Sequence, residues 1–281
     1  MLFFLFQIWS AIAGPRVVAI GDLHADPEAT KAVLKMTELI DDQGAWVGHD
    51  AVLIQTGDVT DKGPSSRGVI RLLSQLQKEA RLAGGDVIGV LGNHEVMNLI
   101  GDWRGVQPQD VAEYGARETR MADLRPRGEM GQWIQAARMV VFHGDTVYVH
   151  GGVKSEIAEY GREELQKIQA KHVGSKQFTP LFGVNGPLWY RGYLQNDEPT
   201  ACVELEKALK HLGAVRMVMG HTTQKTGRIT TRCEGAIVAI DTGISAYAGN
   251  HFSAFELING DGRAIYPNET VDLPDPKITD K

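Results

Sequence analysis

The sequence predicts an α/β domain, and residues 50–94 carry the observations behind this prediction. Two short runs rich in Val, Ile and Leu, 51–55 and 87–91, are each followed by Gly and then by polar residues, as buried strands often are. The segment between them, 65–83, has apolar residues at helical spacing. A strand, a helix and a second strand in this order form the β-α-β unit of α/β proteins.

Short apolar runs predict further elements around this unit. A β-branched strand over 17–20 comes first, and the helix after Pro27 has Ala29, Val33, Met36 and Ile40 on one face. Later in the chain we expect strands over 146–149, 214–219, 236–240 and 252–257, and helices over about 155–171 and 201–212.

Two segments lack these patterns. Residues 98–138 are rich in Gly, Arg and acidic residues, and we interpret them as an inserted helical segment that either shapes substrate access or covers a sheet edge. Residues 263–281 form a polar tail, and from 268 onwards we expect a loose or disordered strap. The main domain then spans 15–262.

The first 14 residues are apolar but too short to span a bilayer, which takes about 20 residues. They fit a secretory signal peptide over 1–13, with an A-x-A cleavage site at Ala11 and Ala13, although the segment before the apolar run is Met1 alone. The alternatives are a misassigned start or an apolar segment packed on the domain, in a cytoplasmic or organellar protein. The sequon Asn268-Glu269-Thr270 fits secretion but is short enough to arise by chance.

The overall charge limits the classes of partner. The chain has 281 residues, 43% hydrophobic and 23% charged, and a formal net charge of -6. Binding to nucleic acid or to an anionic membrane surface needs a basic patch, and no block of Lys and Arg occurs. We therefore expect no nucleic-acid partner and no transmembrane span.

The two cysteines, Cys202 and Cys233, are too few for a disulfide framework and lack the C-x-x-C spacing of structural zinc sites. One bridge between them could form, but we expect two buried thiols.

Side chains that bind metals follow nearly every predicted strand. One such Asp or His alone is more often a turn residue, a helix cap or a packed side chain, but their joint placement after strands favours one site. Two carboxylates, one amide and three imidazoles are too many for a single tetrahedral zinc and suit two first-row metals bridged by Asp58. Paired metals bind a phosphoryl group and activate a water to attack it, which predicts hydrolysis of a phosphate ester. The candidate ligands are Asp22, His24, Asp58, Asn93, His150 and His221.

The motifs that contain these residues are "GDLHAD", "GDVTDKG", "GNHE", "VHGG" and "GHTT". In this order, and each after a strand, they resemble the motifs of the calcineurin-like metallophosphoesterases, and within them the PPP-type phosphatases, particularly the Shewanella-like protein phosphatases. The resemblance spans about 17–257 and implies a metallophosphoesterase catalytic domain, in which two sheets form a central sandwich between layers of helices (αββα).

The resemblance also implies roles for individual residues. One metal ion would be held by Asp22, His24 and Asp58, and the other by Asp58, Asn93, His150 and His221; the ions would be Mn, Fe or Zn, divalent or mixed-valence. His94 would protonate the leaving group and Asp61 would orient it, which agrees with the ability of His to donate a proton near neutral pH.

Phosphate binding is where the sequence departs from the family. The family has Arg directly after the residue matched by Asp61, but this chain has Lys62. Lys keeps the charge and loses the forked geometry, so we expect a weaker grip on phosphate or a changed substrate preference. Arg191 resembles the family's second phosphate-binding Arg, and the resemblance implies that Asn93 would be a third phosphate contact and that Asp241 would have a supporting role.

These observations predict a dinuclear phosphomonoesterase that hydrolyses phosphoprotein through a metal-bridging hydroxide. The Shewanella-like resemblance favours phosphotyrosine over phosphoserine and phosphothreonine. A hydrolase of a small phosphorylated metabolite or dinucleoside polyphosphate is the alternative, because it would share the metal core. A third hypothesis is a catalytically inactive scaffold. The presence of all six ligands, His94 and Asp61 argues against it.

Overall fold

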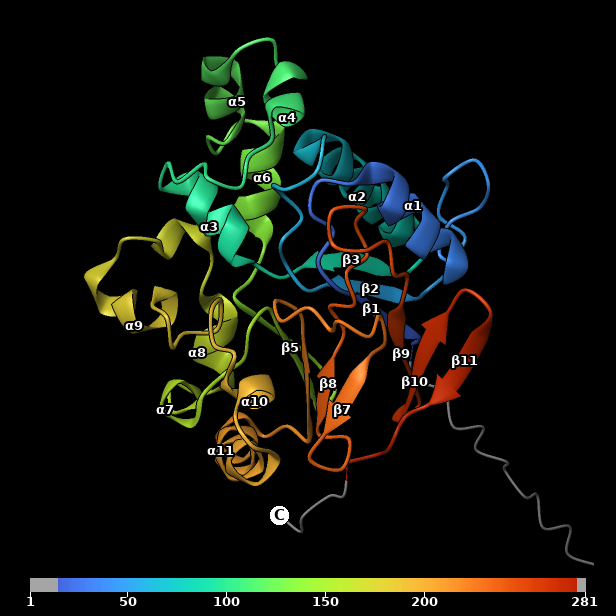
Figure 1. The fold of residues 1–281 in the computed structure, drawn as a ribbon, viewed down its shortest axis with the longest axis vertical. Coiled ribbons are helices and arrows are strands. Elements are labelled where there is room, and N and C mark those ends of the chain that lie inside the picture. Colours follow the sequence, from blue (N-terminus) through green and yellow to red (C-terminus); the bar gives the residue numbers. More distant parts are fainter. Residues whose placement is uncertain (1–14, 277–281) are drawn as a thin grey trace, which may run out of the picture.

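Two β-sheets packed face to face form the centre of the structure, a computed structural model that describes residues 15–276 (Figure 1). The candidate signal peptide or apolar segment at 1–14 lies outside the described residues. The first sheet has the order β11-β10-β9-β1-β2-β3, and the second has the order β4-β5-β6-β8-β7. The strands of the first sheet are β1 (Val17–Ile20), β2 (Val52–Gln55), β3 (Asp86–Gly89), β9 (Ala254–Ile258), β10 (Asp261–Tyr266) and β11 (Glu269–Asp272); those of the second are β4 (Val140–His143), β5 (Thr146–Val149), β6 (Arg216–Met219), β7 (Thr230–Arg232) and β8 (Ile237–Ala239).

Alternating side chains of the strands divide the core into two parts. Because successive residues of a strand point to opposite faces, one set meets the other sheet and the next set meets helices. Between the sheets lie buried residues that include Ala19, Ile54, Tyr148, Val218 and Phe255. The larger cluster on the outer faces joins the helices to both sheets.

Helices cover both outer faces. α1 (Pro27–Met36) and α2 (Ser66–Leu82) pack on the first sheet, with α2 against β3. Beside the second sheet lie α7 (Ser155–Ala158), α8 (Arg162–Lys167), α10 (Gly192–Gln195) and α11 (Glu198–Leu212) (Figure 1). The short helices η1 (Ala170–His172), η2 (Lys176–Phe178) and α9 (Thr179–Phe182) lie between α8 and α10 in the chain, and η1 contacts α6. The predicted αββα arrangement is confirmed.

The segment 98–138 is helical. It continues α3 (Asn93–Leu99) into α4 (Pro108–Ala112), α5 (Arg117–Asp123) and α6 (Glu129–Ala136). α6 packs on α2 and β3, whereas α4 and α5 project from the body of the domain (Figure 1). Through α6, the insert therefore contacts the first sheet at β3, the strand whose following loop carries Asn93 and His94.

Strand register brings the candidate ligands together. β1, β2 and β3 run parallel, with Ile20 opposite Gln55 and Gln55 opposite Gly89. In the second sheet β5, β6 and β8 also run parallel, and Val149 pairs with Met219. Six loops therefore leave the carboxyl ends of parallel strands, the edge where ligands bind in α/β sheets.

The structure differs from the sequence prediction in one expected helix and in four strands that were not expected. The single helix expected over 155–171 is divided, because Gly161 has a φ of 78° and begins a new helix. The strap expected from 268 onwards is wrong for Glu269–Asp272, which form the exposed edge strand β11 paired with β10, so the boundary at 262 falls inside β10. β4 and β7, short strands at the edges of the second sheet, were not predicted, and neither was β10.

The expectation of two free thiols is also wrong, because Cys202 and Cys233 form a disulfide. Cys202 lies on α11 and Cys233 follows β7, and their Cα atoms are 5.4 Å apart, within the usual range for a disulfide. The bridge ties the helical layer to the second sheet.

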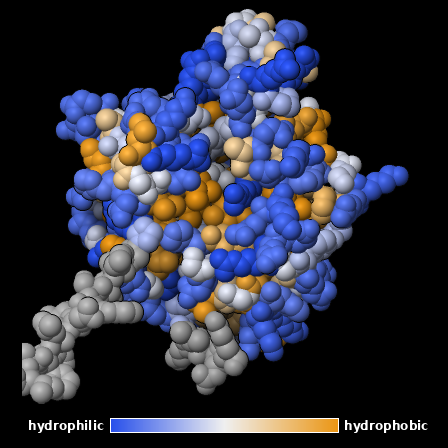
Figure 2. Space-filling model, turned by 180° about the vertical axis from the view of Figure 1, so that it is seen from behind, coloured by the Kyte–Doolittle hydropathy of each residue, from blue (hydrophilic) through white to orange (hydrophobic). Residues whose placement is uncertain are grey.

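The surface is mostly hydrophilic, but apolar residues gather near the middle of the rear face (Figure 2). Partly buried side chains that pack on the core between the sheets include Val52, Ile88, Tyr266 and Leu273. Among residues 15–276 no helix combines the length and apolar character needed to cross a bilayer.

Candidate metal centre

The predicted ligands all lie in the loops that leave the carboxyl edge of the two sheets. Their side chains are buried, with exposed fractions of 5% or less. Asp22 and His24 follow β1, Asp58 follows β2, Asn93 begins α3 after β3, His150 follows β5, and His221 follows β6.

Asp58 lies at the centre of this set. Its Oδ1 is 3.3 Å from Nε2 of His150, and its Oδ2 is 3.9 Å from Nε2 of both His24 and His94. Two groups of side chains, each with ligand atoms within 4.8 Å of one another, share this carboxylate: His24 with His94, and His150 with His221. One carboxylate thus faces two candidate cation positions.

Asp22 and Asn93 complete the two groups. Asp22 Oδ2 is 3.8 Å from His24 Nε2, and its Oδ1 accepts the backbone N–H of His221 at 3.1 Å. The Oδ1 of Asn93 lies 2.9 Å from His150 Nε2. The structure therefore brings together all six residues predicted as ligands.

The backbone that carries these ligands is locally unusual. His24, Asp58 and His221 have φ values of 43°, 56° and 64°, in the left-handed region that non-glycine residues rarely adopt. Such strain concentrates at functional sites and persists only where surrounding contacts enforce it. Here Asp58 C=O accepts the N–H of His24 at 2.9 Å. A Cβ at Gly220, before His221, would lie 2.5 Å from Asp22 Oδ1, so a larger residue at this position of "GHTT" would displace the Asp22 carboxylate.

The electrostatic environment prepares His24, His221 and Asp58 for cations, whereas neighbouring carboxylates raise the pKa of His150 to about 9 despite its burial. Burial lowers the pKa of His24 to about 3 and that of His221 to about 2, so both rings are neutral, the form that binds metals. Burial would raise the pKa of Asp58, but the charges of His150 and His94 hold it well below its usual range. Burial and the neighbouring Asp241 raise the pKa of Asp22 well above its usual value, a repulsion that a bound cation would relieve.

One buried nitrogen indicates directly that a cation fits. Nε2 of His221 is buried without a hydrogen-bond partner in the described part of the chain. A buried polar atom without a partner is costly, and a metal ion would satisfy it. Buried carboxylates, imidazoles and an amide around one point are the donors that suit divalent first-row metals.

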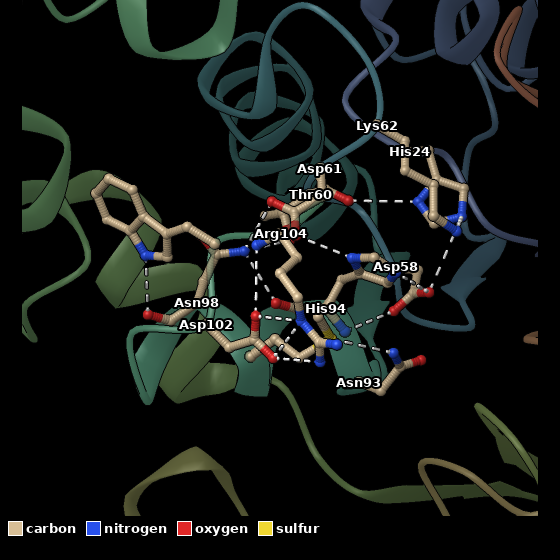
Figure 3. Close-up of polar contacts among 12 residues, drawn as sticks. His24, Asp58, Thr60, Asp61, Lys62, Asn93, His94, Asn98, Asp102 and Arg104 are labelled. Atoms are coloured by element: carbon tan, nitrogen blue, oxygen red, sulfur yellow. Dashed lines mark hydrogen bonds and ion pairs between the residues drawn. The ribbon is translucent and has the colours of Figure 1, made fainter. Parts of the chain in front are cut away.

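The predicted dyad is formed beside this cluster. Nδ1 of His94 donates to Oδ2 of Asp61 at 2.9 Å, and its Nε2 faces Asp58 (Figure 3). Both residues are buried, with His94 more accessible at 8% exposure. His94 thus points one nitrogen at a carboxylate and the other at the candidate cation positions.

The two predicted phosphate-binding cations lie at opposite ends of the ligand set. Lys62 Nζ is 2.9 Å from His24 Nε2, whereas Arg191 Nη1 donates to the backbone oxygen of His221 at 2.6 Å and to Thr222 Oγ1 at 3.2 Å. Both side chains reach the cluster from its rim.

Sequence reasoning missed several residues that support the site. Glu95 is buried and accepts hydrogen bonds from the backbone N–H groups of Gly92, Asp58 and Thr60, so it joins the loops after β2 and β3. Glu95 is the last residue of "GNHE", but its role in joining the loops becomes visible only in the structure, where the side chain is buried. Asp241, expected to be supporting, accepts from Thr223 Oγ1 at 2.7 Å. Asn98, Asp110 and Arg120 of the insert also form a buried polar group next to Asp61.

Comparisons with known proteins agree with this geometry. Residues 15–225 match the family model described as calcineurin-like phosphoesterase. An uncharacterised protein of Schizosaccharomyces pombe is 38% identical over 259 residues, covering 86% of this chain and 78% of its own. Shewanella-like protein phosphatase 2 of Arabidopsis thaliana is 31% identical over 281 residues, covering 82% and 71%. The crystal structure of the cold-active protein-tyrosine phosphatase of a psychrophilic Shewanella species superposes with a TM-score of 0.77 at 28% identity, covering 92% of this chain and 80% of that one.

The predicted family is confirmed by these similarities. The family match includes every candidate ligand from Asp22 to His221. The chain therefore belongs to the calcineurin-like phosphoesterases and is a metal-binding hydrolase that acts on phosphoric esters.

Proposed function

We propose that this chain is a dinuclear protein phosphatase and that phosphotyrosine is its preferred substrate. The position of Asp58 carries the dinuclear part of the proposal. Its two carboxylate oxygens face separate groups of imidazoles, so one residue can bridge two ions. Asp22 and His24 would complete one position, and Asn93, His150 and His221 the other; the ions would be Mn, Fe or Zn.

Two such ions, when bound, supply charge that attracts phosphoryl oxygens and lowers the pKa of water. The protein buries the ligand side chains, and electrostatic interactions among buried groups are stronger than in water. The neutral rings of His24 and His221 and the ionised carboxylate of Asp58 are ready to bind without a change in protonation.

We assign the leaving-group proton to His94. A serine or tyrosine leaving oxygen needs a proton, and an imidazolium can donate it. The hydrogen bond from Nδ1 to Asp61 fixes the ring so that Nε2 faces Asp58 and the candidate cation positions, where a phosphoryl group would bind. Asp61 then stabilises the charged ring before the proton leaves.

Lys62 and Arg191 would bind the phosphate from either end, and the amide of Asn93 would add a third contact. Arg191 is held by His221 C=O and Thr222, so its guanidinium is oriented before substrate arrives. Lys62 offers a point charge without a fork, so we expect its grip to be the weaker of the two.

The substrate class rests on relatives. One similar protein is named a Shewanella-like protein phosphatase, and a structural neighbour is a protein-tyrosine phosphatase. These names favour phosphoprotein, and the second favours phosphotyrosine. The alternative, a small phosphorylated metabolite or dinucleoside polyphosphate, would use the same ligands and differ in the surrounding cleft.

A substrate panel tests the proposal. Protein loaded with Mn, Fe or Zn would be assayed with peptides that carry phosphotyrosine, phosphoserine or phosphothreonine in one matched sequence, and with diadenosine tetraphosphate. We expect metal-dependent phosphate release with the highest kcat/KM for the phosphotyrosine peptide. A higher kcat/KM for phosphoserine would reverse the residue preference, and hydrolysis of the dinucleotide alone would replace the phosphatase with the alternative.

A further inference from the structure

Asn98, at the end of α3, makes two contacts with the dyad. Its Nδ2 donates to Asp61 Oδ1 at 2.8 Å and to the backbone oxygen of His94 at 2.9 Å (Figure 3). The other oxygen of Asp61 accepts from His94 Nδ1 at 2.9 Å. Each oxygen of the Asp61 carboxylate therefore has its own donor, so the carboxylate cannot rotate without losing a hydrogen bond.

Arg120 determines which way the amide of Asn98 faces. Its Nη1 donates to Asn98 Oδ1 at 2.7 Å. A guanidinium can only donate and an ionised carboxylate can only accept, so a reversed amide would place an oxygen against Asp61 and an N–H group against Arg120. Only the orientation with Nδ2 toward Asp61 satisfies both neighbours.

Arg120 is itself fixed on several sides. Its Nε donates to Asp110 Oδ2 at 2.9 Å, and its guanidinium lies over the ring of Trp103 at 4.8 Å. Its Nη2 is 3.6 Å from Asp61 Oδ1. Asp110 in turn accepts from the backbone N–H and the hydroxyl of Ser66, at the start of α2. Arg120, Asp110 and Asp61 have no solvent exposure.

Stability alone is a weak reason for such a cluster. Two buried carboxylates share one guanidinium, and desolvation of three charges can cost more than their attraction returns. A group that fixes the geometry of a reacting side chain is worth this cost, because misplacement of about 1 Å can reduce a rate by about 10²-fold. The cluster connects the insert to the dyad, and Asn98 Nδ2 also lies 3.5 Å from Oγ1 of Thr60 beside it.

We propose that Asn98, oriented by Arg120, is a positioning residue that holds Asp61, and through it the ring of His94, in line with the leaving oxygen. This inference rests on the proposed role of His94 as the leaving-group acid. It gives the insert a specific task, which is to align the proton donor. Loss of the alignment should then harm a substrate in proportion to its need for a proton.

Two aryl phosphates separate this role from a general structural one. Phenyl phosphate releases a basic oxygen that needs a proton, whereas 2,4-dinitrophenyl phosphate releases a stable anion that needs none. In Asn98→Ala and in Arg120→Lys we expect kcat for phenyl phosphate to fall by about 10- to 100-fold, less than full loss of general acid catalysis. For the dinitrophenyl ester we expect a change of less than about threefold.

Tyr114→Phe is the matched control in the insert. It removes the hydrogen bond from Tyr114 Oη to Asp123 Oδ2. In the described part of the chain neither Tyr114 nor Asp123 forms a hydrogen bond or ion pair with Asp61 or Asn98, so we expect kcat for both esters to change equally or not at all. Asp61→Asn is the reference for loss of the dyad. Adding Asn98→Ala to Asp61→Asn should cause no further selective loss, because both act through one carboxylate.

The outcomes distinguish the two proposals. If Asp61→Asn loses activity selectively on phenyl phosphate while Asn98→Ala and Arg120→Lys lower kcat for both esters equally, the positioning role is wrong and the proposed acid stands. If Asp61→Asn itself shows no selectivity, the role of the dyad fails and the positioning role fails with it. Selective loss in all three variants supports both.

Discussion

The ammonium nitrogen of Lys62 lies 2.9 Å from Nε2 of His24 (Figure 3). The other ring nitrogen, Nδ1, faces the backbone oxygen of Thr60 at 3.4 Å, so Nε2 is the nitrogen that would bind a metal. Lys62 contributes to the lowered pKa of His24 after the larger effect of burial. A metal ion and the ammonium group cannot both use this lone pair, and their charges repel.

Lys62→Met should therefore strengthen metal binding and weaken substrate binding. The Lys62 ammonium lies a few ångströms from the expected ion, and the repulsion between the two charges is on the order of a few kcal/mol. Without this charge we expect Mn²⁺ affinity to rise by roughly tenfold or more. KM for a phosphate ester should rise, because one phosphate-binding cation is gone. Titration calorimetry with Mn²⁺ and steady-state kinetics measure the two effects.

Lys31→Met is a control for this variant, because Lys31 forms only an exposed pair with Glu28. Lys62→Arg should lower KM below that of the native chain if forked geometry is what Lys lacks. Unchanged metal affinity and KM in Lys62→Met would remove Lys62 from the site.

Asp58→Asn tests the shared ligand. The neutral amide cannot bridge two cations as a carboxylate does. Mutation of a residue that only supports a metal ligand already lowers metal affinity or activity by about 10- to 100-fold, so for the ligand itself we expect kcat to fall by more than about 100-fold. Elemental analysis should show reduced metal content. Asp41→Asn, which alters a surface turn held by Asp41 Oδ1, should leave activity and metal content unchanged. An active Asp58→Asn protein with full metal content would contradict the dinuclear assignment.

The elements that carry the ligands could be predicted because their signals are local. A β-branched run followed by Gly and a polar residue marks the end of a buried strand, and parallel register brings such ends together. β11 was missed because it lacks this local signal. Its burial pattern is almost entirely exposed, so nothing in 269–272 alternates, and its pairing with β10 decides its conformation.

The support behind the dyad could not be predicted for a different reason. Asn98 and Arg120 are separated by 22 positions in a segment without strand pattern, and a buried Arg in such a segment has the same sequence signal as an exposed one. The disulfide depends on how α11 packs on the second sheet, so spacing alone left it undecided.

Removal of that disulfide should lower the thermal stability of the protein and leave its catalytic activity unchanged. The bridge closes a loop of 31 positions between α11 and the segment after β7, and such bridges contribute about 2–4 kcal/mol. We expect the Cys202→Ser, Cys233→Ser double variant to melt about 5–10 °C lower. Thermal unfolding with and without reductant measures this. Reductant should destabilise the native chain and leave the double variant unchanged; equal effects on both would point to another cause.

The pH dependence of kcat should report the ionisation of His94. Burial would lower the pKa of this imidazole, but the charge of Asp58 and the hydrogen bond to Asp61 outweigh burial and raise it. The acid form exists below the pKa, so kcat for phenyl phosphate should fall as the pH rises through this raised value. Asp61→Asn removes the negative charge that strengthens this hydrogen bond and helps to raise the pKa of His94, so the alkaline limb should move to lower pH. An alkaline limb that stays in place in Asp61→Asn would assign it to a group other than His94. Of the two side chains in the described site that donate a hydrogen bond to the Asp61 carboxylate, His94 and Asn98, only His94 titrates.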